Sequence, residues 1–321
     1  MKLKLIPAAL LLTLVGAAQA QVTVYGLVDY SYGKNAINGT AAGTGDAYDA
    51  FQFGDGSVAH GNSTTRVGLK GTTDVGGGYK TNFQLEANAV APAGFKFGRQ
   101  AWAGISGGFG EVRFGTQDSV AFQTLAGFDM NGAANDTYTG AMSGVQSAGQ
   151  NGTSNAQYFS PTFGGLQVRA GLTPKGNNST VATDPNAKSA YALGLSFANG
   201  PFAAAAAYES ATTDNAALSG GSAYSAIGGS YDFGAAKVSL VYANGGTNVK
   251  GTSLGVAFPV GAATVGAQYS KNSDTQDSGT ELFFNTPVFK NTTAYVDYGR
   301  KNVSASGVST NAYSVGMILA F

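Results

Sequence analysis

The sequence predicts an all-β fold, a transmembrane antiparallel β-barrel of about 16 strands with long outer loops. Three observations lead to this: period-2 alternation over segments of barrel-strand length, turn signals at even spacing, and a final strand that ends on Phe321. In that strand the bulky residues share one parity and the small ones the other, with Ile318 as the exception. Its 11 residues, 311–321, are enough to cross a bilayer when tilted. A closed barrel also needs its last strand to pair with its first.

The first 20 residues predict a secretory signal peptide. Lys2 and Lys4 form a charged start, residues 5–15 are a short apolar core, and Ala18 and Ala20 frame a small-residue cleavage site. The apolar run is too short to span a membrane. A first helix of a globular domain is the weaker alternative. We expect residues 1–20 to be removed and residues 21–321 to form a single barrel domain.

Composition excludes several other classes of protein. Residues 1–20 contain two of the 18 basic residues and no acidic one, so the remaining chain has a net charge of −2 and no basic excess for nucleic acid. Cysteine is absent, so no disulfide framework supports an exported fold. Mean hydropathy is −0.02, and no stretch after residue 20 is continuously apolar for 18 residues, which argues against a helical membrane protein. The 48 glycines occur together with 16 Tyr and 19 Phe, a combination typical of a membrane barrel rather than a disordered chain.

Turn signals divide the chain into segments. Seven short turns, in order along the chain, are residues 75–78, 107–110, 161–165, 199–201, 232–234, 259–261 and 287–291. Eight longer polar stretches alternate with them, at 34–62, 91–97, 117–152, 176–188, 210–221, 244–249, 272–279 and 303–308. This alternation predicts about 16 strands with short turns at one end and longer loops at the other.

The faces of the strands follow from residues 79–88. Lys80 and Glu86 share one parity with three amides, whereas Phe83 and Leu85 lie on the other parity. A charge facing lipid costs up to about 2–4 kcal/mol, so the polar row is expected to face a water-filled lumen. A soluble β-sandwich would bury the apolar face instead, and periodicity alone does not separate the two. The number of segments, their even spacing and the terminal Phe321 favour the membrane barrel.

Five motifs, in order, resemble trimeric general porins of the beta-proteobacterial type. They are V-T-V-Y-G-L-V-D at 22–29, T-R-V-G-L-K-G at 65–71, G-R-Q-A-W-A-G at 98–104, N-A-Q-Y-F-S-P-T-F-G-G at 155–165 and Y-V-D-Y-G-R at 295–300. The resemblance implies a 16-stranded barrel that assembles as a homotrimer. It also implies that the third long loop, 117–152, folds into the lumen and narrows it.

The resemblance also implies a pore constriction. Arg66, Lys70 and Arg99 match the basic wall of such porins, and the loop carboxylates expected opposite them are Asp118, Asp129 and Asp136. Parity adds further lumen-facing cations at unspecified depth, namely Lys80, Arg113 and Arg169. The chain departs from the family pattern at residues 126–129, which contain no Glu, and at 152–153, which contain no Arg. In the alternative interpretation, the three wall cations are ordinary solvated lumen residues that tune selectivity slightly.

The expected function is passive diffusion of small hydrophilic solutes and ions across the cell outer membrane, with a weak preference for anions. A substrate-selective channel and a structural or adhesive barrel without an open pore remain as alternatives. We expect no catalytic residue, cofactor or metal, because His60 is the only histidine and lies in a Gly-rich polar loop. Expected partners are outer-membrane lipid, a second and third copy of the chain, and the barrel-assembly machinery, which would recognise Phe321. Trp102 and the strand tyrosines are expected to lie in the interfacial aromatic girdles.

Overall fold

The computed structural model describes residues 21–34, 49–54, 61–89, 96–132, 154–177, 188–210, 223–245 and 250–321. Within these ranges a single sheet of 17 antiparallel strands closes on itself. The first eight strands are β1 (Gln21–Lys34), β2 (Ala50–Phe53), β3 (Arg66–Gly76), β4 (Tyr79–Asn88), β5 (Gln100–Gly107), β6 (Gly110–Thr116), β7 (Ser154–Phe159) and β8 (Leu166–Thr173). The others are β9 (Ala190–Asn199), β10 (Phe202–Glu209), β11 (Tyr224–Asp232), β12 (Lys237–Asn244), β13 (Lys250–Val260), β14 (Ala263–Asn272), β15 (Ser278–Phe289), β16 (Thr292–Val303) and β17 (Val308–Ala320). Three short helices complete the described part, α1 (Val120–Leu125), η2 (Ala126–Phe128) and η3 (Lys175–Asn177).

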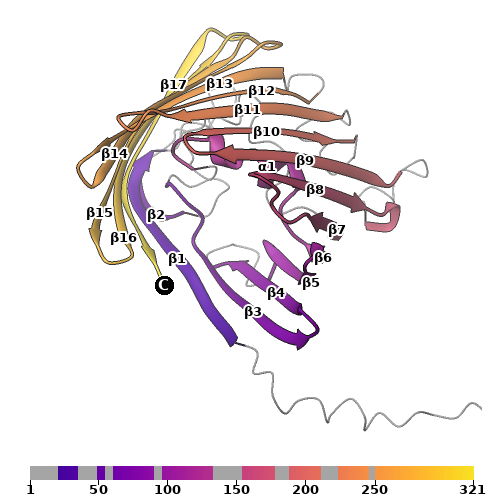
Figure 1. Ribbon diagram of the computed structural model, residues 1–321. Coiled ribbons are helices and arrows are strands. Elements are labelled where there is room, and N and C mark those ends of the chain that lie inside the picture. Colours follow the sequence, from indigo (N-terminus) through magenta and orange to yellow (C-terminus); the bar gives the residue numbers. More distant parts are fainter. Residues whose placement is uncertain are drawn as a thin grey trace, which may run out of the picture.

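The barrel closes where β17 pairs with β1, from Leu27 opposite Ala320 to Lys34 opposite Tyr313 (Figure 1). The backbone N–H groups of Gly26 and Phe321 each donate to the other residue's carbonyl at 3.0 Å. The ring of Phe321 lies over Gly26, where an added Cβ would lie 2.6 Å from its Cζ atom. The expected pairing of the last strand with the first is confirmed, and it depends on glycine at position 26.

The 17 strand segments occupy 16 positions around the barrel. β3 pairs with the first half of β1, and the four-residue β2 pairs with the second half, so β2 and β3 together fill one position. The prediction of about 16 strands is therefore confirmed. The sequence pattern missed β2 because it is short and lies in a polar, Gly-rich stretch. Two stretches expected to be longer loops are instead short connections, between β14 and β15 and between β16 and β17.

The apolar side chains of the alternating strands point to the outer surface of the barrel. Leu240, Leu254 and Leu282, for example, are 50–54% exposed on the chain alone. The strand tyrosines Tyr79, Tyr208, Tyr242, Tyr269 and Tyr298 are exposed in the same way. No described helix is long and apolar enough to cross a membrane. The exposed leucines and tyrosines form an apolar outer face on the strands, as expected for a barrel in lipid.

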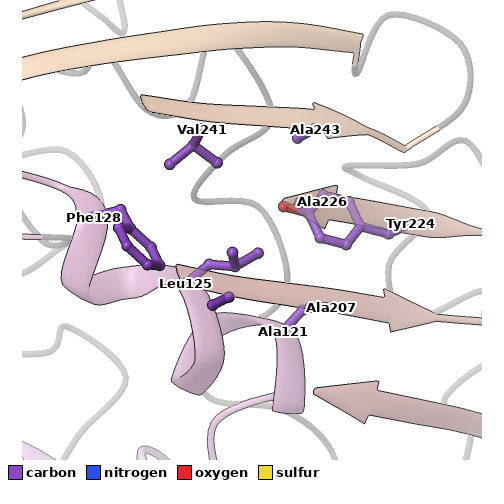
Figure 2. Packing of buried hydrophobic residues seen from close by; sticks show 9 residues of the cluster. Ala121, Leu125, Phe128, Ala207, Tyr224, Ala226, Val241 and Ala243 are labelled. Atoms are coloured by element: carbon purple, nitrogen blue, oxygen red, sulfur yellow. The ribbon is translucent and has the colours of Figure 1, made fainter. Parts of the chain in front are cut away.

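The third long loop enters the barrel, as expected. Figure 1 shows α1 inside the ring of strands, and it contacts β8, β9, β10 and β11. Figure 2 shows Leu125 and Phe128 of this loop directed at the strand residues Ala207, Ala226 and Val241. These residues belong to the buried apolar cluster of the described part, which lies between the loop and the inner wall rather than at the barrel centre. Burying a Leu or Phe side chain contributes about 1.5–3 kcal/mol, so the contact stabilises the inward position of the loop.

Polar groups fix the start of this loop. The Ser119 hydroxyl caps α1 by accepting from the backbone N–H of Phe122 at 3.1 Å. The Glu209 carboxylate, on the inner face of β10, accepts from the backbone N–H of Ala121 at 2.9 Å. Because the first N–H groups of a helix lack partners within the helix, these two oxygens satisfy donors that would otherwise be buried and unpaired.

Candidate functional site: a narrowed pore

The described part of the loop lies against one side of the inner wall. Beyond α1 and η2, the Met130 N–H donates to Gln268 Oε1 on β14 at 2.9 Å. The Asn131 side-chain amide donates to Glu281 on β15 at 2.7 Å and to Asp297 on β16 at 3.0 Å. The described part of the loop therefore follows the wall from β8 to β16. Arg66 on β3 faces the described part of the loop across a gap, and this gap is the narrowed passage.

A cavity of about 510 Å³ marks this passage. Arg66 lines it from β3, Phe122 from the loop, and Asn285 and Ile318 from β15 and β17. Ile318, the bulky exception in the small-residue parity of the last strand, thus faces the pore. The described lining of the passage combines one cation, several amides and a few apolar groups.

Arg66 and Arg99 meet at a shared carboxylate. The Arg99 Nε donates to Glu86 Oε1 at 2.7 Å, and the Arg66 Nε lies 3.8 Å from Glu86 Oε2. The Tyr25 hydroxyl donates to the same Glu86 oxygen as Arg66, at 2.8 Å. The side chain of Arg66 is 26% exposed, whereas those of Arg99 and Glu86 are 8% and 7% exposed. Arg66 is therefore the member of this group that meets the pore water.

Lys70 lies farther towards the short-turn end than the two arginines. It is exposed, and its Nζ lies 5.0 Å from the centre of the Tyr25 ring. Lys70 follows Arg66 by four residues on β3, which at about 3.3 Å per residue places it about 13 Å along the strand. The three expected wall cations thus lie on one wall but at two depths.

The expected loop carboxylates are not one group. Asp118 lies close enough to Arg66 for an electrostatic interaction. Asp129 lies against the opposite wall, where Gln268 Nε2 donates to it at 3.5 Å. Burial and the negative charge of Glu281 raise the pKa of Asp129 to about 7. Asp136 is outside the described residues, as is His60.

Three wall carboxylates were not anticipated as a group. Asp29, Glu281 and Asp297 are 0–1% exposed and lie on β1, β15 and β16. Asp29 accepts from the backbone N–H groups of Asn62 and Ser63 and from the Tyr295 hydroxyl, at 2.6–2.7 Å. The alternation of side chains places Asp29 and Asp297 on the inner face of their strands. It does not indicate that their hydrogen-bond partners include residues of a loop. Among the described residues no three carboxylate, histidine or cysteine groups are arranged to hold a metal ion.

The expectation for Trp102 was wrong. Trp102 is 8% exposed and faces the lumen, where the Arg113 guanidinium lies 4.2 Å from its ring centre. Strict alternation would put Arg99 on the face opposite Trp102, yet Arg99 also reaches Glu86 inside the barrel. Arg99 precedes β5, which begins at Gln100, so strand parity does not apply to it.

Similarity to known proteins agrees with this geometry. A family profile described as Gram-negative porin matches residues 8–306. An outer membrane porin protein of Bordetella pertussis is 30% identical over 292 residues, covering 81% of this chain and 74% of that protein. Outer membrane porin protein 32 of Delftia acidovorans is 32% identical over 269 residues, covering 77% of this chain and 73% of that protein.

A solved structure, the anion-selective porin from Comamonas acidovorans, superposes with a TM-score of 0.73 at 26% identity, covering 94% of this chain and all of that one. An OmpT variant of Vibrio cholerae with a loop deletion, at 15% identity and a TM-score of 0.65, shares the fold. The matching profile, the relatives and the closed 16-position barrel all agree, and the chain therefore belongs to the family of Gram-negative porins.

Proposed function

We propose that the protein forms a water-filled channel for passive diffusion of small hydrophilic solutes and ions, with a weak preference for anions. It resides in the cell outer membrane, and its relatives are channels rather than enzymes. One of the solved relatives carries the description anion-selective, which supports the same direction of preference here.

The single observation that carries the anion preference is a difference in accessibility. The wall cations Arg66 and Lys70 reach the lumen water. The carboxylate residues Glu86, Glu281 and Asp297, each taken as a whole residue, are at most 6% exposed. A buried, hydrogen-bonded carboxylate still contributes to the field, but an ion in the lumen approaches the exposed cations more closely. Since screening limits each charge to about 10 Å at 0.1 M salt, these local cations outweigh the net charge of the chain.

The test is the reversal potential of a single channel in a KCl gradient. The wild-type protein is expected to give the sign of an anion-preferring pore, and Arg66→Gln is expected to move it towards cation preference by several-fold in permeability ratio. Arg300→Gln, at an exposed arginine outside this passage, is the matched control. Cation preference in the wild type would overturn the proposed ion preference, and a folded barrel that does not conduct would overturn the channel itself.

The double variant Arg66→Gln/Arg99→Gln tests the two arginines of the wall together. Removal of both cations leaves Glu86 as an uncompensated carboxylate facing the passage, so the expected shift exceeds that of Arg66→Gln alone. Equal shifts would indicate that Arg99, which is buried, contributes only by orienting Glu86.

Assembly as a homotrimer and recognition of Phe321 by the barrel-assembly machinery are further parts of the proposal, as is removal of residues 1–20. The pairing of Phe321 with Gly26 supports a role for the last residue in closing the barrel. Deletion of Phe321 should lower the amount of folded barrel and leave protease-sensitive chain in the periplasm.

The trimer has its own test. Unheated samples on denaturing gels should migrate as a trimer that dissociates on boiling. Migration as a monomer at every temperature would contradict the trimer.

A further inference from the structure

A second basic region lies away from the narrowed passage, towards the short-turn end of the barrel. A cavity of about 730 Å³ opens there on the inner wall, lined by Lys70, Lys80, Trp102 and Arg113. Two carboxylates, Asp74 and Glu111, also line it. Asp74 accepts from the backbone N–H of Gly76 at 2.8 Å, and so it also caps the turn between β3 and β4.

Arg113 is held rigidly in this region. Its guanidinium lies 4.2 Å from the ring centre of Trp102 and 4.3 Å from that of Phe159. One of its terminal nitrogens donates to Glu111 at 2.7 Å. The two rings fix the plane of the guanidinium, and the carboxylate fixes its rotation, while 24% of the side chain stays exposed. An arginine fixed in this way loses little side-chain entropy when it binds a ligand.

Arg169 lies close to Arg113, and the two positive charges repel each other. Arg169 donates to the Ser196 hydroxyl at 3.1 Å. The Nε atoms of both arginines are buried and have no hydrogen-bond partner within the described protein. Two like charges close together favour an anion that bridges them through terminal N–H groups that Glu111 and Ser196 do not use.

The geometry points to a second anion site in this pore, formed by Arg113 and Arg169 with Lys80 nearby, for small solutes that carry a carboxylate or phosphate group. Because the rings of Trp102 and Phe159 both contact the Arg113 guanidinium, its N–H edge is the part expected to meet a ligand. Edge-on recognition by paired N–H donors suits the oxygens of an oxyanion rather than an aromatic ring. The assignment rests on the proposed function as an open channel.

This second site is separate from the narrowed passage. Arg113 aligns across the sheet with Gly104, Asn82 and Thr72, and Thr72 follows Arg66 by six residues on β3. At about 3.3 Å per residue the separation along the strand is about 20 Å, twice the screening length at 0.1 M salt. An anion therefore meets two independent positions in sequence. Weak binding at several sites in series allows a solute both to enter and to leave a selective pore.

The single tryptophan of the chain, Trp102, reports on this site because it contacts Arg113. The experiment titrates the folded protein with inorganic phosphate, and separately with acetate, against chloride at equal ionic strength, and follows Trp102 emission. A saturable change with phosphate and acetate that chloride does not produce is expected. Arg169→Gln should raise the apparent Kd about tenfold or more, the effect of losing one charge-assisted hydrogen bond.

Two further variants separate this inference from the proposed function. Arg300→Gln, remote from the site, should retain the wild-type titration. Arg66→Gln should also retain the titration while its reversal potential shifts. A pore that prefers anions but shows no saturable response of Trp102, or the same Kd in Arg169→Gln, would overturn the second site and leave the channel function standing. Saturable binding in a barrel that does not conduct would overturn the channel and leave the site.

Discussion

The inner wall of the barrel has two halves of opposite character. The open half, β1 and β3–β6, presents Arg66, Lys70 and Arg113 to the lumen. The covered half, around β10–β12, presents the small apolar residues Ala205 and Ala207, together with their cluster partners, to the loop. Both halves alternate with period 2, and both have their apolar or aromatic parity on the outside. The difference lies in what the inward parity contacts, which is water on one side and protein on the other.

The comparison shows how non-covalent contacts alone can hold a loop at one position inside a pore. An apolar stripe inside an aqueous lumen is unfavourable unless something covers it. The loop offers Leu125 and Phe128 to that stripe, and Glu209 caps its helix. The charged half offers no such surface. The loop is therefore placed on one wall, and the passage is left beside the other, where the accessible cations are.

The largest expected effect comes from breaking the apolar contact. Leu125→Ala and Phe128→Ala each remove a buried side chain, and such changes cost about 2–5 kcal/mol, here in the free energy of docking the loop. The double variant should release the loop and raise both single-channel conductance and the solute size limit. Deletion of residues 124–147 is the extreme case, and it should give the largest conductance.

Leu240→Ala is the matched control for this contact, because Leu240 is 54% exposed on the outer face of β12. It should leave conductance near the wild-type value. If the deletion of 124–147 leaves conductance and size limit unchanged, the loop does not narrow the pore, and the contrast between the two halves has no functional meaning.

A smaller effect is expected from increasing the net positive charge of the open half. Glu86→Gln removes the carboxylate that Arg66 and Arg99 share, so both cations lose their neutralising partner. Two unit charges about 4 Å apart interact by about 4 kcal/mol at an effective dielectric of 20, before screening. Even a fraction of this should raise the anion-to-cation permeability ratio several-fold, measured as a reversal potential in a KCl gradient.

Glu111→Gln provides the comparison within the same wall, since Glu111 pairs with Arg113 rather than with Arg66. Its effect on the reversal potential should be smaller, because Arg113 lies beyond the screening length from the narrowed passage. Breaking a buried ion pair destabilises a protein by about 3–5 kcal/mol, so gel migration before and after heating must first show that Glu86→Gln folds. If a folded Glu86→Gln channel has the wild-type reversal potential, the Arg66 charge does not set selectivity.

The sequence predicts the barrel better than it predicts the site, for physical reasons. Strand number follows from the even spacing of the turn signals. The strand faces and the closure follow from the alternation of residues 79–88 and from the terminal Phe321, and all of these signals depend on local geometry. The pairing of Glu86 with Arg66 and Arg99 depends on side chains from three segments, and parity places these residues only on a wall. Trp102 lies opposite Gln84 in the sheet, which places it on the inner face, and this alignment follows from the strand pairing rather than from residue type. The different positions of Asp118 and Asp129 depend on the path of the loop along the wall, and this path is set by the tertiary contacts of Leu125, Phe128 and Asn131.

The smallest expected effect concerns pH and the far end of the loop. Asp129 lies outside the membrane-spanning strands, and it faces Gln268 on β14 and Glu281 on β15, with Asp297 on β16 and Asp29 on β1 in the same carboxylate group. Burial, and secondarily the charge of Glu281, raise its pKa from 3.8 to about 7. The docked loop therefore holds the proton more tightly than a released loop does. Docking through Asp129 is strongest below about pH 4 and weakens as the pH rises towards 7.

Current fluctuations of single channels at pH 5 and pH 8 measure this difference. The wild-type channel should fluctuate a few-fold more at pH 8, less than the tenfold per pKa unit of a fully isolated group, because solvent screens part of the interaction. Asp129→Asn cannot ionise and should abolish the increase, whereas Asp274→Asn, at an exposed carboxylate in the β14–β15 connection, should retain it. If Asp129→Asn shows the same rise, Asp129 is not the group whose charge loosens the loop. The attachment of this end of the loop to β15 and β16 would then depend on the hydrogen bonds of Asn131 to Glu281 and Asp297 rather than on Asp129.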